Sequence, residues 1–406
     1  MADRALPLAG VRVLDCSRVL AGPFATMVLA DLGADVVKLE PPAGDESRDW
    51  GPPFWGAPGD RVSAYFASVN RNKRSVVVDL GTDGGRELLD LLASRSDLLV
   101  HNARPLSAER LGLGADRLAE RHPGLVVAVV GGFAIAGEGA DRPAYDLLAQ
   151  AVTGLMAVTG EPSGGPMKVG VALLDLLAGL EVAVGALAGL LAAERRGRRL
   201  GQGTQIEVRG SRIEVALVEA GVASLINVLG NLVATHEEPM RFGNAHPNIV
   251  PYEVFATADG HAAIAVGNDR QFASLITALN LAPDDRFATN ADRVAHRAEL
   301  IPLLAGAIAT RRRDELVGAL IAADVPAGPV NLVSEALAMM EATADGAWLQ
   351  DIGMTRLAPN PIWVNGERLP AREAPPGLGE HTDAVLSEAG MDAERIAGLR
   401  AARVVA

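Results

Sequence analysis

Cysteine and aromatic residues are scarce in this chain of 406 residues. Cys16 is the only cysteine, so neither an intrachain disulfide nor a cysteine-based zinc site can form. Aromatic residues make up 4% of the sequence, and small aliphatic residues are abundant, which favours helices packed closely on a sheet over a β-sandwich. The formal net charge of −13 argues against general binding to nucleic acid or to a membrane surface. A local basic cluster can still bind an anionic ligand.

Several familiar signatures are also missing. There is no G-x-G-x-x-G fingerprint after the first predicted strand and no Walker loop, so a nicotinamide, flavin or ATP site is not indicated. The seven histidines include no H-E-x-x-H motif, which argues against a metal site. The first residues lack the basic-then-apolar pattern of a signal peptide, and we therefore expect a cytoplasmic protein.

The first third of the chain alternates short apolar segments with helical ones. Strands are predicted at 11–14, 34–40, 75–80, 97–100 and 125–130, and helices at 21–33 and 85–94. This rhythm predicts an α/β fold with a doubly wound, mostly parallel, Rossmann-like sheet. Ligands of such sheets bind beyond the carboxyl ends of the strands.

After residue 151 the pattern becomes mainly helical. We predict a helix at 176–195, a Gly/Arg-rich turn at 196–203, a strand at 205–208 and a helix at 211–235. A hairpin of strands 252–257 and 261–266 precedes helices at 271–279 and 298–310. We therefore expect a large domain built from both chain ends, 1–212 and 334–406. A linker helix at 213–235 and a smaller α+β domain at 236–333 complete the expected organisation.

Asp175 stands inside the otherwise apolar run 169–180. Removing an ionised carboxylate from water is costly unless partners compensate for the lost hydration. One explanation is structural: the carboxylate accepts backbone N–H bonds at a helix N-terminus. The other explanation is chemical: the carboxylate takes part in a reaction. The stretch 171–193 also has the length of a transmembrane helix, but Asp175 and Glu181 interrupt it, so a buried or interface helix is the better prediction.

Eight short segments occur together in one order along nearly the whole chain. They are 14–25, 30–42, 70–75, 101–105, 142–146, 243–252, 325–331 and 378–383. This series resembles the class III coenzyme A transferases (CaiB/BaiF type), the family of formyl-CoA and carnitine CoA-transferases. The resemblance implies an acyl-CoA:carboxylate CoA-transferase that takes CoA and acyl-CoA as substrates and uses no metal, nicotinamide or flavin.

The resemblance implies that Asp175 is the catalytic nucleophile. Its carboxylate would attack the acyl-CoA thioester and give a mixed acyl–aspartyl anhydride and CoA thiolate, which returns to form an aspartyl-CoA thioester. Desolvation and positioning raise the reactivity of this otherwise weak nucleophile. Backbone N–H groups are expected to stabilise the oxyanion. Gly179, one helical turn later, leaves room on that face.

The residues that would bind CoA are also implied by the resemblance. They are Val19, Leu20 and Ala21 in the first strand–helix loop, Asn102, Ala103 and Arg110 around the adenine and phosphates, and Val78 as an apolar adenine contact. The basic residues Arg104, Arg71, Lys73 and Arg74 are predicted to form a patch that suits several phosphate charges. For Arg71 and Arg74 the alternative is a solvated surface charge. Tyr145, Asp146 and His246 are candidate active-site neighbours.

Three positions depart from the family pattern. Position 103 is often aromatic in the family and is Ala103 here, and the loop at 132–139 has lost the usual glycine pattern. The tetraglycine loop of formyl-CoA transferases is replaced by Ala245-His246-Pro247-Asn248, which suggests acids other than formate or oxalate as substrates. His246 either contacts an acceptor carboxylate or is structural.

Two other functions remain open at this point. The same fold serves 2-methylacyl-CoA racemases, which need a His–Asp acid/base pair, but Tyr145 stands where that histidine is expected. A tyrosine, with an ordinary pKa of about 10, is a poor base at neutral pH, which favours transfer. A non-catalytic acyl-CoA-binding protein is the third alternative, and the presence of Asp175 argues against it. The resemblance further implies an interlocked, ring-like homodimer that binds an acyl-CoA and a carboxylic acid, with no nucleic-acid or membrane partner.

Overall fold

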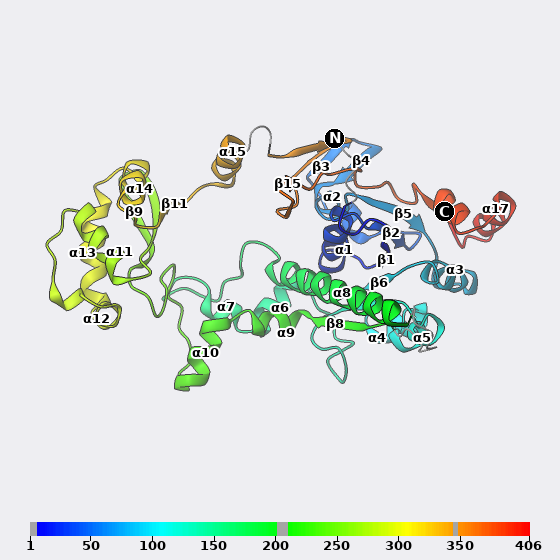
Figure 1. Cartoon of the computed structure of the whole chain (residues 1–406), viewed down its shortest axis with the longest axis horizontal. Helices are drawn as coiled ribbons and strands as arrows, with labels where there is room; N and C mark the ends of the chain where they lie inside the picture. Colours follow the sequence, from blue (N-terminus) through cyan, green and yellow to red (C-terminus); the bar gives the residue numbers. More distant parts are fainter. Residues whose placement is uncertain (1–5, 201–209, 344–347) are drawn as a thin grey trace. The chain divides into compact units, whose positions relative to one another are not determined.

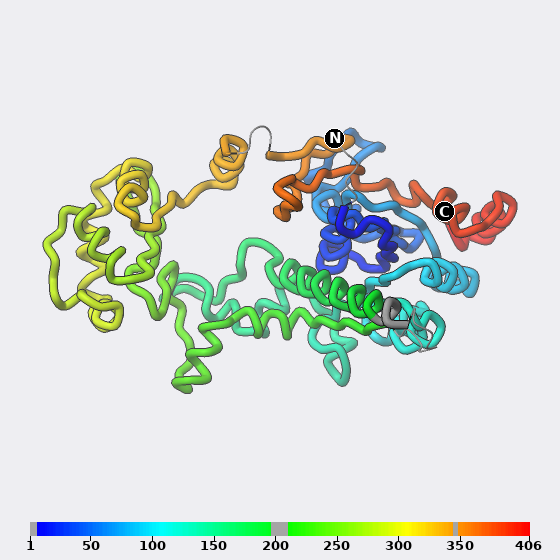
Figure 2. Tube along the Cα trace, in the orientation of Figure 1, coloured from blue at the N-terminus to red at the C-terminus, as the bar shows by residue number. Residues whose placement is uncertain are grey.

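The computed structural model describes residues 6–200, 210–343 and 348–406, without the side chains of 196–200. The chain forms two compact units (Figures 1 and 2). Unit 1 comprises Met1–Leu155, Val169–Leu229 and Ala347–Ala406, and unit 2 comprises Met156–Lys168 and Gly230–Gly346. Unit 2 contains the expected small domain 236–333 and also takes up flanking residues on both sides. The expected domain boundaries themselves stay a prediction.

Unit 1 is built around a six-stranded sheet in which all neighbouring strands run parallel. In spatial order the strands are β5 (Lys73–Val77), β2 (Asp35–Glu40), β1 (Arg12–Cys16), β6 (Leu98–His101), β7 (Val126–Gly131) and β8 (Arg212–Ala216). The chain fills the sheet outwards from β1 on one side and from β6 on the other. The predicted large parallel sheet is confirmed, and its strand order reverses between β1 and β6.

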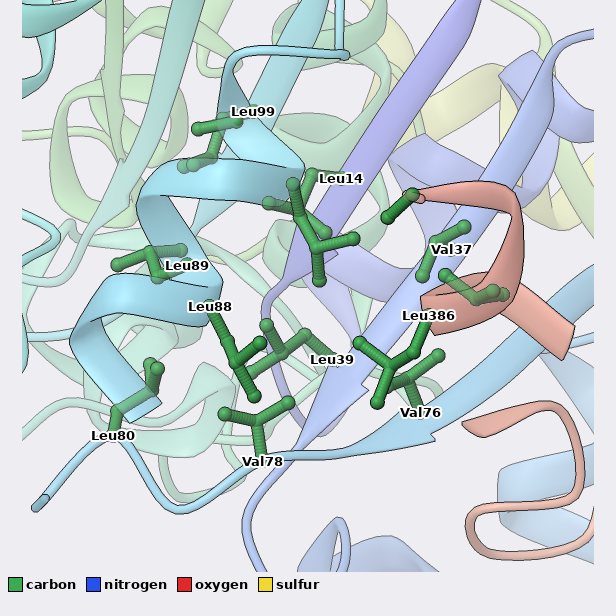
Figure 3. Close-up of a cluster of buried hydrophobic side chains, with 14 of the residues drawn as sticks. Leu14, Val37, Leu39, Val76, Val78, Leu80, Leu88, Leu89, Leu99 and Leu386 are labelled. Carbon is green, nitrogen blue, oxygen red and sulfur yellow. The ribbon is translucent and has the colours of Figure 1, made fainter. Parts of the chain in front are cut away.

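One face of this sheet is covered by an apolar layer that includes residues of the C-terminal segment. Leu14, Val37 and Leu99 from neighbouring strands pack against α3 (Asp83–Ala93) and α16 (Thr382–Glu388). Figure 3 shows this cluster, with Leu88 and Leu89 from α3 and Leu386 from α16. Because residues from both chain ends share one core, the last part of the chain is an integral part of unit 1.

The other face is covered by α1 (Ala21–Asp31) and α8 (Leu173–Leu200). Their buried residues include Ala25 and Leu29 of α1 and Leu174, Ala178 and Val182 of α8. By length and composition, the part of α8 from Leu173 to Arg195 is long and apolar enough to cross a membrane. Among the described residues, the bent pair α9 (Leu217–Ala223) and α10 (Ile226–Thr235) passes the same test when its two helices are taken together.

Part of the expected secondary structure after residue 195 is wrong. The helix α8 continues to Leu200, through the first residues of the predicted turn 196–203. The predicted helix 211–235 begins instead as strand β8, because Ile213 and Val215 alternate with polar residues and the segment pairs in parallel with β7. The predicted strand 205–208 lies outside the described residues.

Unit 2 contains an antiparallel sheet in the order β11 (Ala327–Pro329), β10 (Gly260–Ala265) and β9 (Tyr252–Thr257). Thr257 pairs with Gly260, so the predicted hairpin is confirmed. Phe255 and Ile264 pack against α11 (Asp269–Ala278), α13 (Arg297–Ala309) and α14 (Arg313–Ala322). Unit 2 therefore has an α+β core of its own.

The remaining elements of the described chain are short, with the exception of α15. They are η1 (Glu46–Asp49), β3 (Phe54–Ala57), β4 (Asp60–Ser63), α2 (Ala64–Ser68), α4 (Pro105–Leu111), α5 (Ala115–Arg121), α6 (Asp146–Val152), α7 (Leu155–Val158), η2 (Asp285–Phe287), α12 (Asn290–Ala295), α15 (Val333–Thr343), β12 (Gln350–Ile352), β13 (Thr355–Leu357), β14 (Trp363–Val364), β15 (Glu367–Arg368) and α17 (Ala393–Ala401).

Candidate active site

The loops that follow β1 and β6 meet where the strand order reverses. The backbone N–H of Arg18 donates to Asn102 Oδ1 at 3.0 Å, and Asn102 Nδ2 donates to the Arg18 carbonyl at 2.7 Å. The next residue, Val19, has a φ of 72°, a left-handed conformation that is rare for a β-branched residue. These contacts join the two loops and place the start of α1 beside them.

Asp175 lies in the first turn of α8, but it does not cap the helix. That role belongs to Asp146, whose Oδ1 accepts the backbone N–H of Leu174 at 2.8 Å. The second oxygen of Asp146 accepts a hydrogen bond from Gln150 at 2.6 Å. One of the free amides at the start of α8 is therefore bound by a side chain from α6, which leaves the Asp175 carboxylate available for another purpose.

Asp175 lines a cavity of about 290 Å³ at this edge of the sheet. Six other residues named in the sequence analysis line the same cavity: Val19, Leu20, Ala21, Asn102, Arg104 and Tyr145. Further lining residues include Arg18, Glu46, Gly131, Gly132, Arg142 and Leu217. The fold thus brings together segments that are more than 150 residues apart in the sequence.

The electrostatics of the cavity favour a basic carboxylate. Burial, and then the neighbouring charge of Asp146, raise the pKa of Asp175 to about 7. Three arginines, Arg18, Arg104 and Arg142, line the cavity and have exposed side chains. The guanidinium of Arg142 also lies over the Phe133 ring, 3.9 Å from its centre. The arrangement can hold an anionic ligand beside a carboxylate that is easily protonated.

Tyr65 is a neighbour of this site that the sequence analysis did not identify. It lies in α2, and burial together with the charges of Asp175, Asp146 and Asp45 raises its pKa to about 12. Its ring contacts Trp50 edge-on, with the ring centres 4.9 Å apart. The rarity of tyrosine in this chain, with three in total, was the only signal available in the sequence.

Several predicted site residues do not line the cavity. Val78 is fully buried and pairs with Val405, and its predicted contact with adenine stays a prediction. Ala103 lines a neighbouring cavity of about 120 Å³, and Arg110 lies in the last turn of α4 with an exposed side chain. Asp146 is buried and acts as the cap of α8.

The predicted basic patch is wrong for Arg71, Lys73 and Arg74, because carboxylates already engage all three. Arg71 forms a buried ion pair with Asp31 at 2.6 Å. The fully buried Lys73 pairs with Asp15 at 3.0 Å. Arg74 pairs with both Asp35 and Glu388. Of the four basic residues named for the patch, only Arg104 reaches the cavity.

His246 lies in unit 2, where its loop is held by local contacts. The ring nitrogen Nδ1 accepts the backbone N–H of Asn248 at 3.0 Å, and the ring centre lies 5.5 Å from that of Tyr252. Arg297 donates to the His246 carbonyl at 2.6 Å. A role for His246 towards an acceptor acid stays a prediction. Among the described residues, no group of three or more His, Cys, Asp or Glu side chains could hold a metal ion.

Fold and cavity together define an α/β protein with a carboxylate of raised pKa at the switch point of a doubly wound sheet. The family is shown by comparison: the sequence model of CoA-transferase family III matches residues 8–382, and the chain belongs to this family. The protein is therefore an enzyme that transfers CoA, and CoA thioesters are the substrates of its class.

Relatives and a solved structure match nearly the full chain. A succinate–glutarate CoA-transferase of Agrobacterium fabrum is 38% identical over 398 residues, which cover 96% of this chain and 97% of that protein. A succinyl-CoA:glutarate CoA-transferase of Homo sapiens is 35% identical over 390 residues, covering 94% and 86%. The crystal structure of a CaiB/BaiF family protein from Brucella suis is 37% identical, covers 95% of this chain and 100% of its own, and superposes with a TM-score of 0.81.

Proposed function

We propose that this enzyme moves CoA between a small acyl-CoA and a carboxylic acid through covalent intermediates on Asp175. The observation that carries the proposal is the position of Asp175, in the first turn of α8 and on the wall of the cavity at the switch point. The pKa of about 7 supports it, because a more basic carboxylate is a better nucleophile.

The first half of the reaction transfers the acyl group to Asp175. A carboxylate oxygen of Asp175 attacks the thioester carbonyl carbon, the C–S bond breaks, and CoA leaves as its thiolate. The product is a mixed anhydride between the acyl group and Asp175. The free N–H groups at the start of α1, at Leu20 and Ala21, are the candidates to stabilise the oxyanion, since α1 has no side-chain cap.

The second half exchanges the acid. The thiolate attacks the carbonyl carbon of Asp175 in the anhydride, releases the first acid and leaves an aspartyl-CoA thioester. The acceptor carboxylate then attacks this thioester and forms a new anhydride with release of the thiolate. Attack of the thiolate on the new acyl carbon gives the product acyl-CoA and regenerates the Asp175 carboxylate, so no other reactant is consumed.

CoA carries several phosphate charges, and Arg18, Arg104 and Arg142 are the residues we assign to bind them. Asn102 joins the two loops beneath them. Tyr65 is a candidate donor to the acid, since a raised pKa keeps its phenol protonated at neutral pH. The names of the relatives favour succinyl-CoA and a small dicarboxylic acid as the substrate pair to test first.

We further propose a cytoplasmic homodimer. The outer face of α8 exposes Leu180, Val184 and Leu191, a row of apolar side chains that supports contact with a second copy. The cytoplasmic assignment is supported by cysteine use, since a chain with only Cys16 makes no intrachain disulfide. We propose that the two subunits of this dimer are interlocked as two ring-like chains.

The decisive experiment tests the covalent intermediate. Wild-type enzyme incubated with succinyl-CoA is treated with hydroxylamine, digested and analysed by mass spectrometry, and we expect a hydroxamate at Asp175. Asp175→Ala should lower transfer from succinyl-CoA to glutarate on the order of 1,000-fold or more. Glu87→Ala removes an exposed carboxylate on α3 and should leave the rate unchanged.

Two outcomes would contradict the assignment of the nucleophile: modification at another residue, or full turnover by Asp175→Ala. A panel of acyl-CoAs and acids, read out by the mass of the acyl-CoA formed, then identifies the substrate pair. Uptake of solvent deuterium at the α-carbon of an acyl-CoA, without transfer, would indicate racemisation instead.

A further inference from the structure

A cluster of buried charged residues lies beneath the loop that lines the cavity. The cluster consists of Asp15 and Lys38 from β1 and β2, Asp45 before η1, and Lys73 at the start of β5. All four are at most 1% exposed, and each acid pairs with a lysine: Lys38 with Asp45 at 2.9 Å and Lys73 with Asp15 at 3.0 Å. Buried ion pairs are costly to assemble and add little net stability, so their presence calls for another explanation.

The ion pair of Lys38 and Asp45 holds the loop after β1 at Ser17 and at Val19, the residue with the left-handed conformation. Lys38 Nζ donates to the Ser17 carbonyl at 2.9 Å as well as to Asp45. Both oxygens of Asp45 lie 3.2 Å from the backbone nitrogen of Val19 and accept its N–H. Because the left-handed conformation of Val19 is unfavourable in isolation, it persists only where surrounding contacts impose it.

The second pair holds the chain just after the loop. Lys73 Nζ donates to the Pro23 carbonyl at 2.8 Å and to Asn70 Oδ1 at 2.9 Å. Its partner Asp15 accepts the backbone N–H of Ser17 at 3.0 Å and the hydroxyl of Thr26 at 2.7 Å. Residues 17–23 are thus held at Ser17, Val19 and Pro23 by buried charged groups, while Leu20 and Ala21 between them line the cavity with Asp175.

We propose that Lys38, Asp45 and Lys73 are positioning residues for acyl transfer, which fix Leu20 and Ala21 against Asp175 without touching the substrate. The inference rests on the proposed function, since it assigns these amides to the reacting thioester. A misplacement of about 1 Å at a reacting centre can lower a rate about 100-fold. A fixed loop therefore serves the chemical step, whereas the same charges contribute little to folding.

Unit 1 offers a matched control for this proposal. Arg71 and Asp31 form another buried ion pair, at 2.6 Å, and their contacts include the Ala358 carbonyl and Asn360 rather than the loop. The test pair is Lys38→Met with Asp45→Asn, and the control pair is Arg71→Met with Asp31→Asn. Each double variant removes one buried charge of each sign and keeps side-chain size nearly constant.

The rate of formation of the covalent Asp175 adduct from succinyl-CoA is measured by rapid quench, at a temperature where circular dichroism shows each variant to be folded. We expect the Lys38/Asp45 variant to lose about 10- to 100-fold in this rate at saturating acyl-CoA. The control should stay within about threefold of the wild-type rate, whatever its change in thermal stability. Equal effects in the two variants, or an unchanged rate in the first, would overturn the proposal.

Hydrogen exchange at the amides of Val19 and Phe24, which are bonded to Asp45 and to the Leu20 carbonyl, gives a second readout that needs no activity. Exchange should accelerate at least tenfold in the Lys38/Asp45 variant and stay unchanged in the control, and unchanged exchange in both would also refute the positioning role. The single variant Asp45→Asn replaces the double variant if that protein does not fold. If the wild-type enzyme forms no adduct with any acyl-CoA, the proposed function is contradicted. The exchange rates would still decide whether Lys38 and Asp45 hold the loop in place.

Discussion

The carboxyl group of Asp175 is placed where its two protonation states are close in free energy. Burial and the charge of Asp146 oppose ionisation and raise its pKa to about 7, whereas an aspartate in water has a pKa of about 3.9. The N-terminal end of a helix favours the anion, but the first amides of α8 are already partly capped by Asp146. Near neutral pH the group is therefore a more basic carboxylate than an aspartate in water, as the proposed nucleophile requires.

This pKa predicts the pH dependence of the reaction. In the proposed reaction only the ionised carboxylate attacks the thioester, so the value of kcat/KM for acyl-CoA should rise about tenfold between pH 6 and pH 8 and then level off. Asp146→Asn removes the like charge while keeping an oxygen for the Leu174 amide, and should shift the rising limb to lower pH. Steady-state rates measured across this range test both expectations. A flat profile between pH 5 and pH 8 would show that another group controls the rate.

The same pKa predicts an effect on stability. The folded pKa lies above the unfolded one, so the folded state binds the proton more tightly and loses stability as pH rises from about 4 to 7. Asp175→Asn removes this loss and should raise the Tm by several degrees at pH 8 and by little at pH 4. Thermal melts at the two pH values, with Glu87→Gln as the control, provide the measurement. A lower Tm for Asp175→Asn at pH 8 would contradict the placement of the carboxylate.

Residues near one another in sequence were easier to predict than residues that only the fold brings together. Asp175 stood out because a charge interrupts an apolar run, and Val19–Ala21 lie in one of the short segments that carry the family resemblance. Tyr65 reaches the site from α2, which no local pattern connects to α8. Arg71 and Lys73 were misassigned because burial beside Asp31 and Asp15 is a tertiary property that charge alone does not reveal.

At the scale of elements, the position of Asp175 depends on how closely α8 approaches α1. A Cβ atom on Gly179 would lie 2.6 Å from the Ala21 carbonyl oxygen and 3.1 Å from the Phe24 ring. Glycine therefore permits a backbone approach that any other residue would prevent. The helix that carries Asp175 is held directly against the helix that begins at Ala21, which lines the same cavity.

Gly179→Ala should consequently lower both stability and activity. Overpacking costs about 1–3 kcal/mol and exceeds the roughly 1 kcal/mol that alanine gains in helix propensity. A displaced α8 should also reduce kcat/KM by about 10-fold or more. Gly398→Ala in α17, where a Cβ meets no atom within 4 Å, is the matched control and should be neutral or stabilising. Chemical denaturation and transfer assays compare the two variants, and equal behaviour would refute the close-approach argument.

Local sequence patterns predict most elements of the sheet but miss those whose conformation depends on distant residues. Strands β1, β2, β6 and β7 and helix α1 were predicted within a few residues, because buried parallel strands form short apolar runs with turn residues between them. Strand β8 was missed because the apolar residues from 213 to 233 resemble a continuing helix. Its strand conformation depends on pairing with β7, which lies more than 80 residues earlier in the chain.

At the scale of the whole molecule, unit 1 depends on both ends of the chain. Val385 and Leu386 of α16 complete the apolar layer around Leu14 and Leu99, so the chain leaves unit 1, forms unit 2 and returns. A chain whose two ends share one unit is compatible with the threading by a second copy that the proposed homodimer requires. The exposed apolar row of α8 would then be covered by that copy.

Interlocking predicts a dimer that does not exchange its subunits. Light scattering should give the mass of two 42.1-kDa chains, and dilution should leave that mass unchanged. When tagged and untagged dimers are mixed, an ordinary two-fold dimer forms mixed dimers by dissociation and reassociation, whereas threaded chains cannot separate without unfolding. We therefore expect no mixed species after days under native conditions, and mixed dimers only after denaturation and refolding of the combined sample. Native mass spectrometry distinguishes the three species; mixed dimers under native conditions would exclude interlocking, and a stable 42.1-kDa species would exclude the dimer itself.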